Sequence, residues 1–219
     1  MKYSYTGERA YYEQALPGAV KPYWHLHPYI TNWLDPERHI RGKRILDLGA
    51  GECEYSRLFT ETFEARSVIA CELIHGRMKF AAGPDRNPRL LFVVGDCFRL
   101  PFRDGTFDTV WLGLVIHQLP DLAEALQEIY RVLKPGGVYI GLEPNPFNII
   151  VLKRYLWGDH SPNQYLLWPW RLRNALQAAG FEGSRISYCS GRSPCLRGPF
   201  VGTSLGILAT KAVAHSARS

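Results

Sequence analysis

The sequence predicts an α/β fold, a doubly wound, mostly parallel seven-stranded sheet with helices on both faces and an antiparallel last strand. Two observations support this prediction. From residue 43 onward, short apolar runs alternate with segments whose apolar residues recur at helical spacing, which is typical of a parallel sheet covered by helices. After residue 180, two apolar runs follow each other with no helical segment between them, which indicates a final pair of strands, read as a hairpin with a long connection.

The predicted strands are short apolar runs that end near glycine, proline or an acidic residue. They are "RILDLG" (44–49), "SVIACEL" (67–73), "LLFVVGD" (90–96), "FDTVWLGL" (107–114), "VYIGLEP" (138–144), "SRISYCS" (184–190) and "LGILATKA" (205–212).

The predicted helices have their apolar residues at helical spacing. They cover residues 53–63, 75–82, 121–134 and 171–180, with two short ones at Glu8–Ala15 and Pro28–Leu34. The helix from residue 121 has the clearest end signals, because Asp121 can cap its N-terminus and Lys134 stands in its expected last turn before Pro-Gly-Gly. This helix should lie on the sheet through one apolar face.

Length and composition predict one domain with a lid and an insert. The 219 residues suffice for one substantial core, so we expect an N-terminal helical lid at 1–42 and a domain at 43–219 with a substrate cap at about 146–170. No apolar run approaches the roughly 20 residues of a membrane span, and the N-terminus has no signal-peptide core, so a cytoplasmic protein is expected.

The charge, the cysteines and the histidines indicate no nucleic-acid partner, no disulfide framework and no metal site. The net charge of +6 comes from scattered lysines and arginines, so a nucleic-acid partner is not expected. Five cysteines without a C-x-x-C motif indicate neither a disulfide framework nor a zinc site. His25 and His27 have no third ligand nearby, and no metal site is expected; their segment reads as part of a lid whose aromatic side chains cover a ligand.

The loop after the first predicted strand is built to hold a ligand. Parallel sheets bind ligands at the carboxyl ends of their strands, and Gly49 and Gly51 allow positive φ and a close approach to the backbone. A dinucleotide would require a small residue where Glu54 stands. S-adenosylmethionine (SAM) has no phosphate, and its ammonium group suits an acid such as Asp47. A tight turn without a ligand is the alternative reading of the glycines alone.

Two further acids follow at successive strand ends. Glu72 ends the second predicted strand, where a carboxylate can accept hydrogen bonds from ribose hydroxyls of either NAD or SAM. Asp96 ends the third, where it can accept from an adenine amino group while the Cys97 N–H reaches a ring nitrogen. Three such edges in a row indicate a nucleoside ligand far more strongly than a glycine pair does.

At this point the chain resembles a known family. The stretch from Arg44 to Glu143, with "LDLGAGE", "ACEL", the block from "GDCFRLPF" to "RVLKPGG" and "EPN", is similar to the class I, Rossmann-like SAM-dependent methyltransferases. It looks most like the branch that acts on small molecules and lipids, such as the ubiquinone/menaquinone methyltransferases. The chain departs from the family pattern at Cys53, where glycine is common, and at Gln118, where a second histidine is common.

The resemblance implies SAM as the cofactor and assigns roles by position. The cofactor-binding positions would be Asp47, Gly49, Ala50, Gly51, Glu72, Leu73, Asp96, Cys97 and Gly113. The candidate catalytic residues are His117, near the sulfonium region, and His160, in the insert that would hold the substrate. Either could act as a general base. An amine or thiol acceptor can react without a general base, whereas a hydroxyl or a carbon acid needs one more often.

The acceptor is expected to be a small or lipid-like molecule. The insert is rich in aromatic residues and carries a few cations, which suits an apolar or anionic ligand, and the same composition would also suit contact with a membrane surface. A helical cap that only packs on the sheet is the alternative. Other functions left open are a catalytically silent methyltransferase-like binding module or partner subunit, an RNA or protein methyltransferase, and an NAD-dependent dehydrogenase. The oligomeric state is open.

Overall fold

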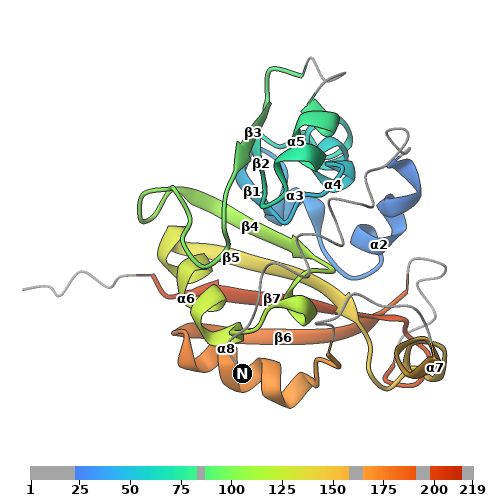
Figure 1. Cartoon of the computed structure of the whole chain (residues 1–219). Helices are drawn as coiled ribbons and strands as arrows, with labels where there is room; N and C mark the ends of the chain where they lie inside the picture. Colours follow the sequence, from blue (N-terminus) through green and yellow to red (C-terminus); the bar gives the residue numbers. More distant parts are fainter. Residues whose placement is uncertain (1–22, 83–86, 158–164, 191–197, 214–219) are drawn as a thin grey trace, which may run out of the picture.

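A computed structural model describes residues 23–82, 87–157, 165–190 and 198–213, and in it the predicted sheet is present (Figure 1). Its seven strands lie in the order β3-β2-β1-β4-β5-β7-β6. Their bounds are β1 Arg44–Leu48, β2 Ser67–Glu72, β3 Leu90–Val94, β4 Phe107–Gly113, β5 Leu133–Pro144, β6 Phe181–Cys189 and β7 Ser204–Lys211. The first five strands pair in parallel, and β7 runs antiparallel to both β5 and β6. The predicted fold class is therefore confirmed.

Helices cover the two faces of the sheet. The helical segments are η1 Trp24–Leu26, α2 His27–Thr31, α3 Pro36–His39, α4 Glu54–Arg57, η2 Leu58–Thr62, α5 His75–Ala82, η3 Ile116–Gln118, α6 Leu122–Val132, α7 Ile149–Trp157 and α8 Pro169–Ala178. Helices α6 and α8 pack on one face, and α2 to α5 lie toward the other (Figure 1).

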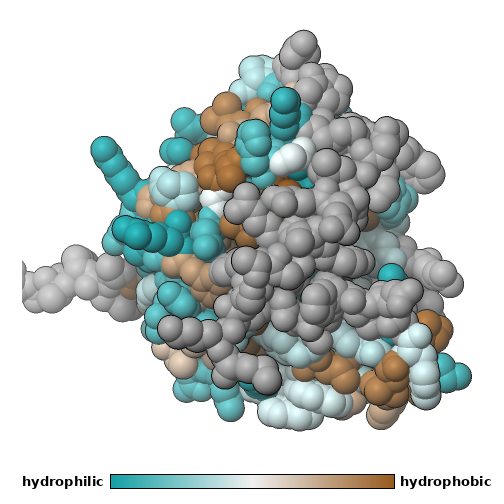
Figure 2. Space-filling model, viewed as in Figure 1, coloured by the Kyte–Doolittle hydropathy of each residue, from teal (hydrophilic) through white to brown (hydrophobic). Residues whose placement is uncertain are grey.

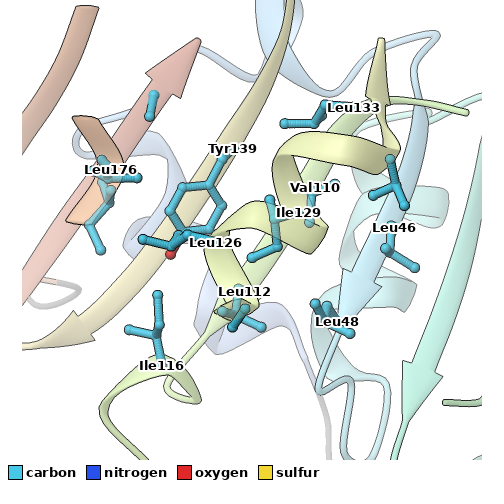
Figure 3. Packing of buried hydrophobic residues seen from close by; sticks show 14 of the residues in the cluster. Leu46, Leu48, Val110, Leu112, Ile116, Leu126, Ile129, Leu133, Tyr139 and Leu176 are labelled. Atoms are coloured by element: carbon cyan, nitrogen blue, oxygen red, sulfur yellow. The ribbon is translucent and has the colours of Figure 1, made fainter. Parts of the chain in front are cut away.

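Two apolar cores result from the alternation of side chains along the strands. Leu46 and Ile69 belong to the core under α6 and α8, where Figure 3 shows Leu126 and Ile129 packed around the ring of Tyr139. Their neighbours in the strands contribute to the second core, under α4 and α5. Because both faces are buried, the central strands are apolar at nearly every position, which is the pattern that made them recognisable.

The helix predicted at 121–134 ends earlier than expected. The Asp121 carboxylate accepts hydrogen bonds from the N–H groups of Ala123 and Glu124, as the cap prediction requires. The helix stops at Val132, and Lys134 lies in β5 instead of the last helical turn, with its ammonium 2.7 Å from Asp108 Oδ1. The placement of Lys134 was wrong because pairing of β5 with β4 already begins at Leu133, ahead of the glycines.

Other expectations fall outside the described residues or on their edge. The predicted helix at Glu8–Ala15, His160 and Cys195 belong to parts of the chain that the structure does not describe. The four cysteines within the described ranges are free thiols. Among the described helices, none is long and apolar enough to cross a membrane.

Candidate functional site

The loop between β1 and α4 has a backbone that depends on left-handed residues. Gly49 has φ +71° and Gly51 has φ +55°, which glycine adopts without steric cost. A Cβ at Gly49 would lie 2.6 Å from Val115 Cγ2. The loop can therefore pack against the residues after β4 only because Gly49 has no side chain. The N–H groups of Gly49 and Ala50 donate to the Cys71 carbonyl, which holds the loop against the end of β2.

Cys53 occupies a third left-handed position in this loop. Its φ of +61° is unusual for a residue with a Cβ, and its side chain is buried. The glycine that is common here in the family would adopt this φ at no steric cost, so the chain carries local backbone strain where α4 begins. Burial raises the pKa of the Cys53 thiol, which therefore stays neutral.

Glu72 connects the first two strand ends. One carboxylate oxygen accepts from the Gly51 N–H at 2.9 Å, and the other accepts from the Ile74 N–H at 3.0 Å. Each carboxylate oxygen can accept a second hydrogen bond, so the group remains able to bind two hydroxyls. Leu73 follows Glu72 directly in the chain and is half-buried.

Asp47 is a buried carboxylate under the same loop. Ser56 Oγ donates to Asp47 Oδ2 at 2.5 Å. The pKa of Asp47 is raised to about 7, mainly by burial, with the lowering effect of Ser56 and the raising effect of the nearby negative charge of Glu72 included. A cation placed beside Asp47 would favour its ionised form, so the position suits a ligand that carries an ammonium group.

The third strand end adds Asp96 and Cys97 to the same edge. The N–H of Gly95 donates to the Glu72 carbonyl at 3.1 Å, so the turn after β3 is attached to the end of β2. Asp96 Oδ1 accepts from the Phe98 N–H at 2.9 Å, which orients the carboxylate, and Asp96 and Cys97 are both half-buried.

The end of β4 closes the site on its other side. Gly113 is the last residue of β4, and a Cβ there would lie 3.0 Å from the indole nitrogen of Trp111. Leu114 follows with φ +59° and donates its N–H to the Leu142 carbonyl on β5. This turn sends the chain back over the sheet into η3, which carries His117.

His117 forms a buried pair with Glu143, at the carboxyl end of β5. His117 Nδ1 lies 2.5 Å from Glu143 Oε2, and the other oxygen of Glu143 accepts from the N–H groups of Val115 and Ile116. The Gln118 amide nitrogen lies 3.4 Å from His117 Nε2. A carboxylate at Nδ1 and an amide donor at Nε2 both favour the tautomer with its proton on Nδ1, so the basic lone pair of the ring is on Nε2.

Sequence reasoning missed the role of Glu143. The signal was present, because Glu143 is an acid directly after the buried run "VYIGL", in the position that Glu72 and Asp96 occupy on their own strands. The partnership with His117 spans 26 residues of sequence and depends on β5 lying beside β4.

The insert packs directly on this pair. The Tyr155 ring of α7 lies 6.3 Å from the His117 ring in an edge-on arrangement. Tyr165 donates its N–H to the His117 carbonyl and its hydroxyl to the Ile116 carbonyl. The two described ends of the insert therefore reach the candidate histidine. His160, the other catalytic candidate, lies outside the described residues.

These contacts place nine predicted cofactor positions and His117 along one edge of the sheet, at the carboxyl ends of β1 to β4. Residues 46–141 match a family model described as a methyltransferase domain. A demethylmenaquinone methyltransferase from Streptomyces griseus is 41% identical over 95 residues, covering 43% of this chain and 40% of the relative. The chain contains a class I, SAM-dependent methyltransferase domain.

Further relatives agree with this assignment. The ubiquinone/menaquinone biosynthesis C-methyltransferase UbiE of Cereibacter sphaeroides is 32% identical to this chain over 158 residues, covering 63% of this chain and 62% of the relative. In neither of these two alignments does the chain span two thirds of the relative's length.

Solved structures share the fold at low identity. A chain from the complex of the Haloferax volcanii Trm112 methyltransferase activator with a methyltransferase has a TM-score of 0.72 at 19% identity, covering 94% of both chains. A SAM-dependent methyltransferase from Thermotoga maritima has a TM-score of 0.67 at 19% identity, covering 87% of this chain and 89% of that one. The [4+2]-cyclase SpnF also matches, with a TM-score of 0.62 at 23% identity, covering 81% of this chain and 78% of that one. Such likeness shows the fold alone.

SAM is the cofactor that the methyltransferase family implies, and the described residues fit it. Three carboxylates, those of Asp47, Glu72 and Asp96, stand at three neighbouring strand ends. They suit an ammonium group, ribose hydroxyls and an adenine amino group, whereas a pyrophosphate beside them and Glu54 would be repelled. Burial raises the pKa of Asp47, and an ammonium group bound beside it would lower that pKa again.

Proposed function

We propose that the chain transfers a methyl group from SAM to a small, apolar or lipid-like acceptor, with His117 as the general base. The paired arrangement of His117 and Glu143 supports this proposal most directly, because it prepares a proton acceptor at the cofactor edge of the sheet. When bound, SAM supplies an activated methyl group on its sulfonium. The protein's own contribution is to orient the acceptor, exclude water and accept a proton.

The proposed cofactor positions lie at the ends of four strands, and each strand end binds a different part of SAM. In this proposal Asp47 faces the ammonium group, with Gly49, Ala50 and Gly51 forming the loop around the amino-acid end. Glu72, followed by Leu73, accepts from the ribose hydroxyls, and the observed bonds from Gly51 and Ile74 hold it in place for this. Asp96 and the Cys97 N–H bind the adenine, while Gly113 lies at the sulfonium region.

The pair of His117 and Glu143 would move the proton. With its proton on Nδ1 donated to Glu143, the ring presents Nε2 to an acceptor hydroxyl or carbon acid. Glu143 is fully buried and its charge would stabilise the imidazolium that forms. A positioned base contributes typically about 10²–10⁴-fold to the rate, which is the contribution assigned to His117 here.

Aromatic rings of the insert and of β6 support an apolar acceptor. The Phe147 ring lies 5.4 Å from that of Trp168 and 6.3 Å from that of Tyr188, and Tyr155 faces His117. Aromatic and apolar walls with few polar groups are typical of sites for small apolar molecules. The two relatives named for quinone biosynthesis make a ring compound with an apolar tail the first acceptor class to test.

Methyl transfer is tested with SAM that carries a labelled methyl group. The protein is incubated with labelled SAM and a lipid extract, and the labelled product is identified by mass spectrometry. We expect a labelled apolar product from the native protein and at least a hundredfold less from His117→Gln, with SAM affinity by calorimetry unchanged. Cofactor binding without any labelled product would contradict the proposal and favour a silent binding module. A cyclase-like function without methyl transfer, as the name of SpnF suggests for that neighbour, would give the same negative result.

A further inference from the structure

Helix α7 exposes several large apolar side chains. At the helical spacing i, i+4, i+7 and i+8, one exposed face carries Ile149, Lys153, Leu156 and Trp157, with Ile150 and Arg154 beside them. Ile150 is 70% exposed and Trp157 77% exposed, and none of the nine residues of α7 is buried. The solvent-facing side of an ordinary surface helix is mainly polar or charged, whereas four of the six exposed residues of α7 are large and apolar.

A neighbouring loop extends this apolar surface. The Asn148 side chain, which precedes α7, accepts from the N–H groups of Ile150 and Val151 and donates to the carbonyls of Phe200 and Val201. Phe200 is 74% exposed, and Val201 is also exposed. The loop and the start of α7 are thus fixed together. Figure 2 shows hydrophobic surface at the lower right, where Figure 1 has α7.

The charges on this surface are positive. Lys153 and Arg154 are exposed on α7, whose nine residues include no acid, and the chain as a whole carries a net charge of +6. Large apolar side chains with tryptophan at one end and cations between them are the composition of helices that lie in the interface of a bilayer. Contiguous exposed apolar surface of this kind marks an interaction site.

The inner side of α7 faces the candidate catalytic pair. Tyr155, on the side opposite Ile150 and Trp157, is the residue whose ring meets His117. One short helix therefore separates the exposed apolar surface from the site. We propose that α7 and the loop 198–201 form a docking surface for an anionic lipid bilayer. If the proposed function holds as well, docking would bring the site to where an apolar acceptor is dissolved.

A bilayer fits this surface better than a protein partner does. Bilayer docking needs apolar side chains that insert and cations that meet anionic headgroups, and both are present on one face of α7. A second copy of the chain would bring two sets of cations, those of Lys153 and Arg154, against each other, which is unfavourable.

Co-sedimentation with lipid vesicles tests the docking surface. The full chain is mixed with vesicles of phosphatidylcholine with phosphatidylglycerol, and separately with vesicles of phosphatidylcholine alone. We expect binding to the anionic vesicles that weakens with salt, and at least about tenfold weaker partitioning of the double variant Ile150→Glu/Trp157→Glu. Lys153→Ala should weaken binding to anionic vesicles roughly fivefold, since one cation near such a surface is worth about 1 kcal/mol.

A matched control uses an exposed apolar residue elsewhere. Leu91 is 53% exposed on β3, at the opposite edge of the sheet from β6, so Leu91→Glu should bind vesicles as the native protein does. Because all substituted side chains are exposed, thermal unfolding should be unchanged in every variant. The proposal is overturned if the native protein stays in the supernatant, if the double variant pellets equally well, if Leu91→Glu loses as much binding, or if the native protein pellets without vesicles.

Vesicle binding is measured without acceptor or cofactor, so it is independent of methyl transfer. Docking with no labelled product would contradict the proposed function alone. Labelled product with no vesicle binding would overturn the docking surface alone.

Discussion

The substitution Glu143→Gln separates the chemistry of the buried pair from its structural role. Glu143 accepts three hydrogen bonds, from the backbone N–H groups of Val115 and Ile116 and from His117. A glutamine keeps a carbonyl oxygen for the two backbone donors but presents an amide N–H to His117 Nδ1. The imidazole proton is then driven to Nε2, and the nitrogen that should accept a proton becomes a donor.

The expected magnitudes differ between two variants at this position. Glu143→Gln should change the free energy of unfolding by less than about 1 kcal/mol, because the two backbone bonds remain. Its turnover should fall about 10²–10⁴-fold, equivalent to about 3–5 kcal/mol of barrier, through the wrong tautomer. Glu143→Ala leaves two N–H groups without their acceptor at about 1–3 kcal/mol each, so it should lose about 2–6 kcal/mol of stability.

Three measurements check this reasoning. Urea unfolding gives the stabilities, calorimetry gives SAM affinity, and transfer of labelled methyl to the acceptor that the labelling experiment identifies gives turnover. In a His117→Gln background, Glu143→Gln should cost no further activity, because Glu143 acts through the histidine. If Glu143→Gln kept turnover within about threefold of the native protein, the pair would not perform base catalysis.

Three other predictions concern the end of β1 and the loop that follows it. Cys53→Gly should change the free energy of unfolding by less than about 1 kcal/mol, because the loss of backbone strain at φ +61° offsets the lost burial of the side chain and the added entropy of the unfolded chain. Cys53→Val should lower the free energy of unfolding by about 2 kcal/mol or more, measured by urea unfolding. Gly49→Ala, whose Cβ would meet Val115, should lose distinctly more stability than Gly42→Ala, which has a similar φ of +68° but no atom within 4 Å; equal losses would show that packing at Gly49 is unimportant. The raised pKa of Asp47 means that the folded state binds more protons than the unfolded state between about pH 4 and 7, so stability should fall as pH rises through this window; Asp47→Asn should remove that part of the slope, and an unchanged slope would contradict it.

Several elements were predictable from the sequence because their cause is local. The strands from Arg44, Ser67 and Phe107 are continuous apolar runs, and such runs are buried on both faces wherever the sheet places them. The cap at Asp121 depends only on residues within one helical turn. Asp47, Glu72 and Asp96 could be expected at one edge because parallel strands share their carboxyl ends.

Other features were decided only by contacts between distant segments. Lys134 lies in β5 because pairing of Leu133 with Phe107 of β4 ends the helix before it. Helix signals in the local sequence contain no information about such a distant partner. The pKa of Asp47 depends on burial beneath a loop, and the strain at Cys53 on the course of that loop. The sequence of α7 does not indicate which of its faces contacts His117.

The sequence by itself therefore determined the alternation of strands and helices from β1 to β5 and the carboxylates at three strand ends, since periodicity and end signals act within a few residues. Only the tertiary structure joined Glu143 to His117 and turned Ile150 and Trp157 outward from Tyr155. Both outcomes depend on where β5 and α7 lie relative to β4 and η3, and that placement is set by the packing of the whole sheet.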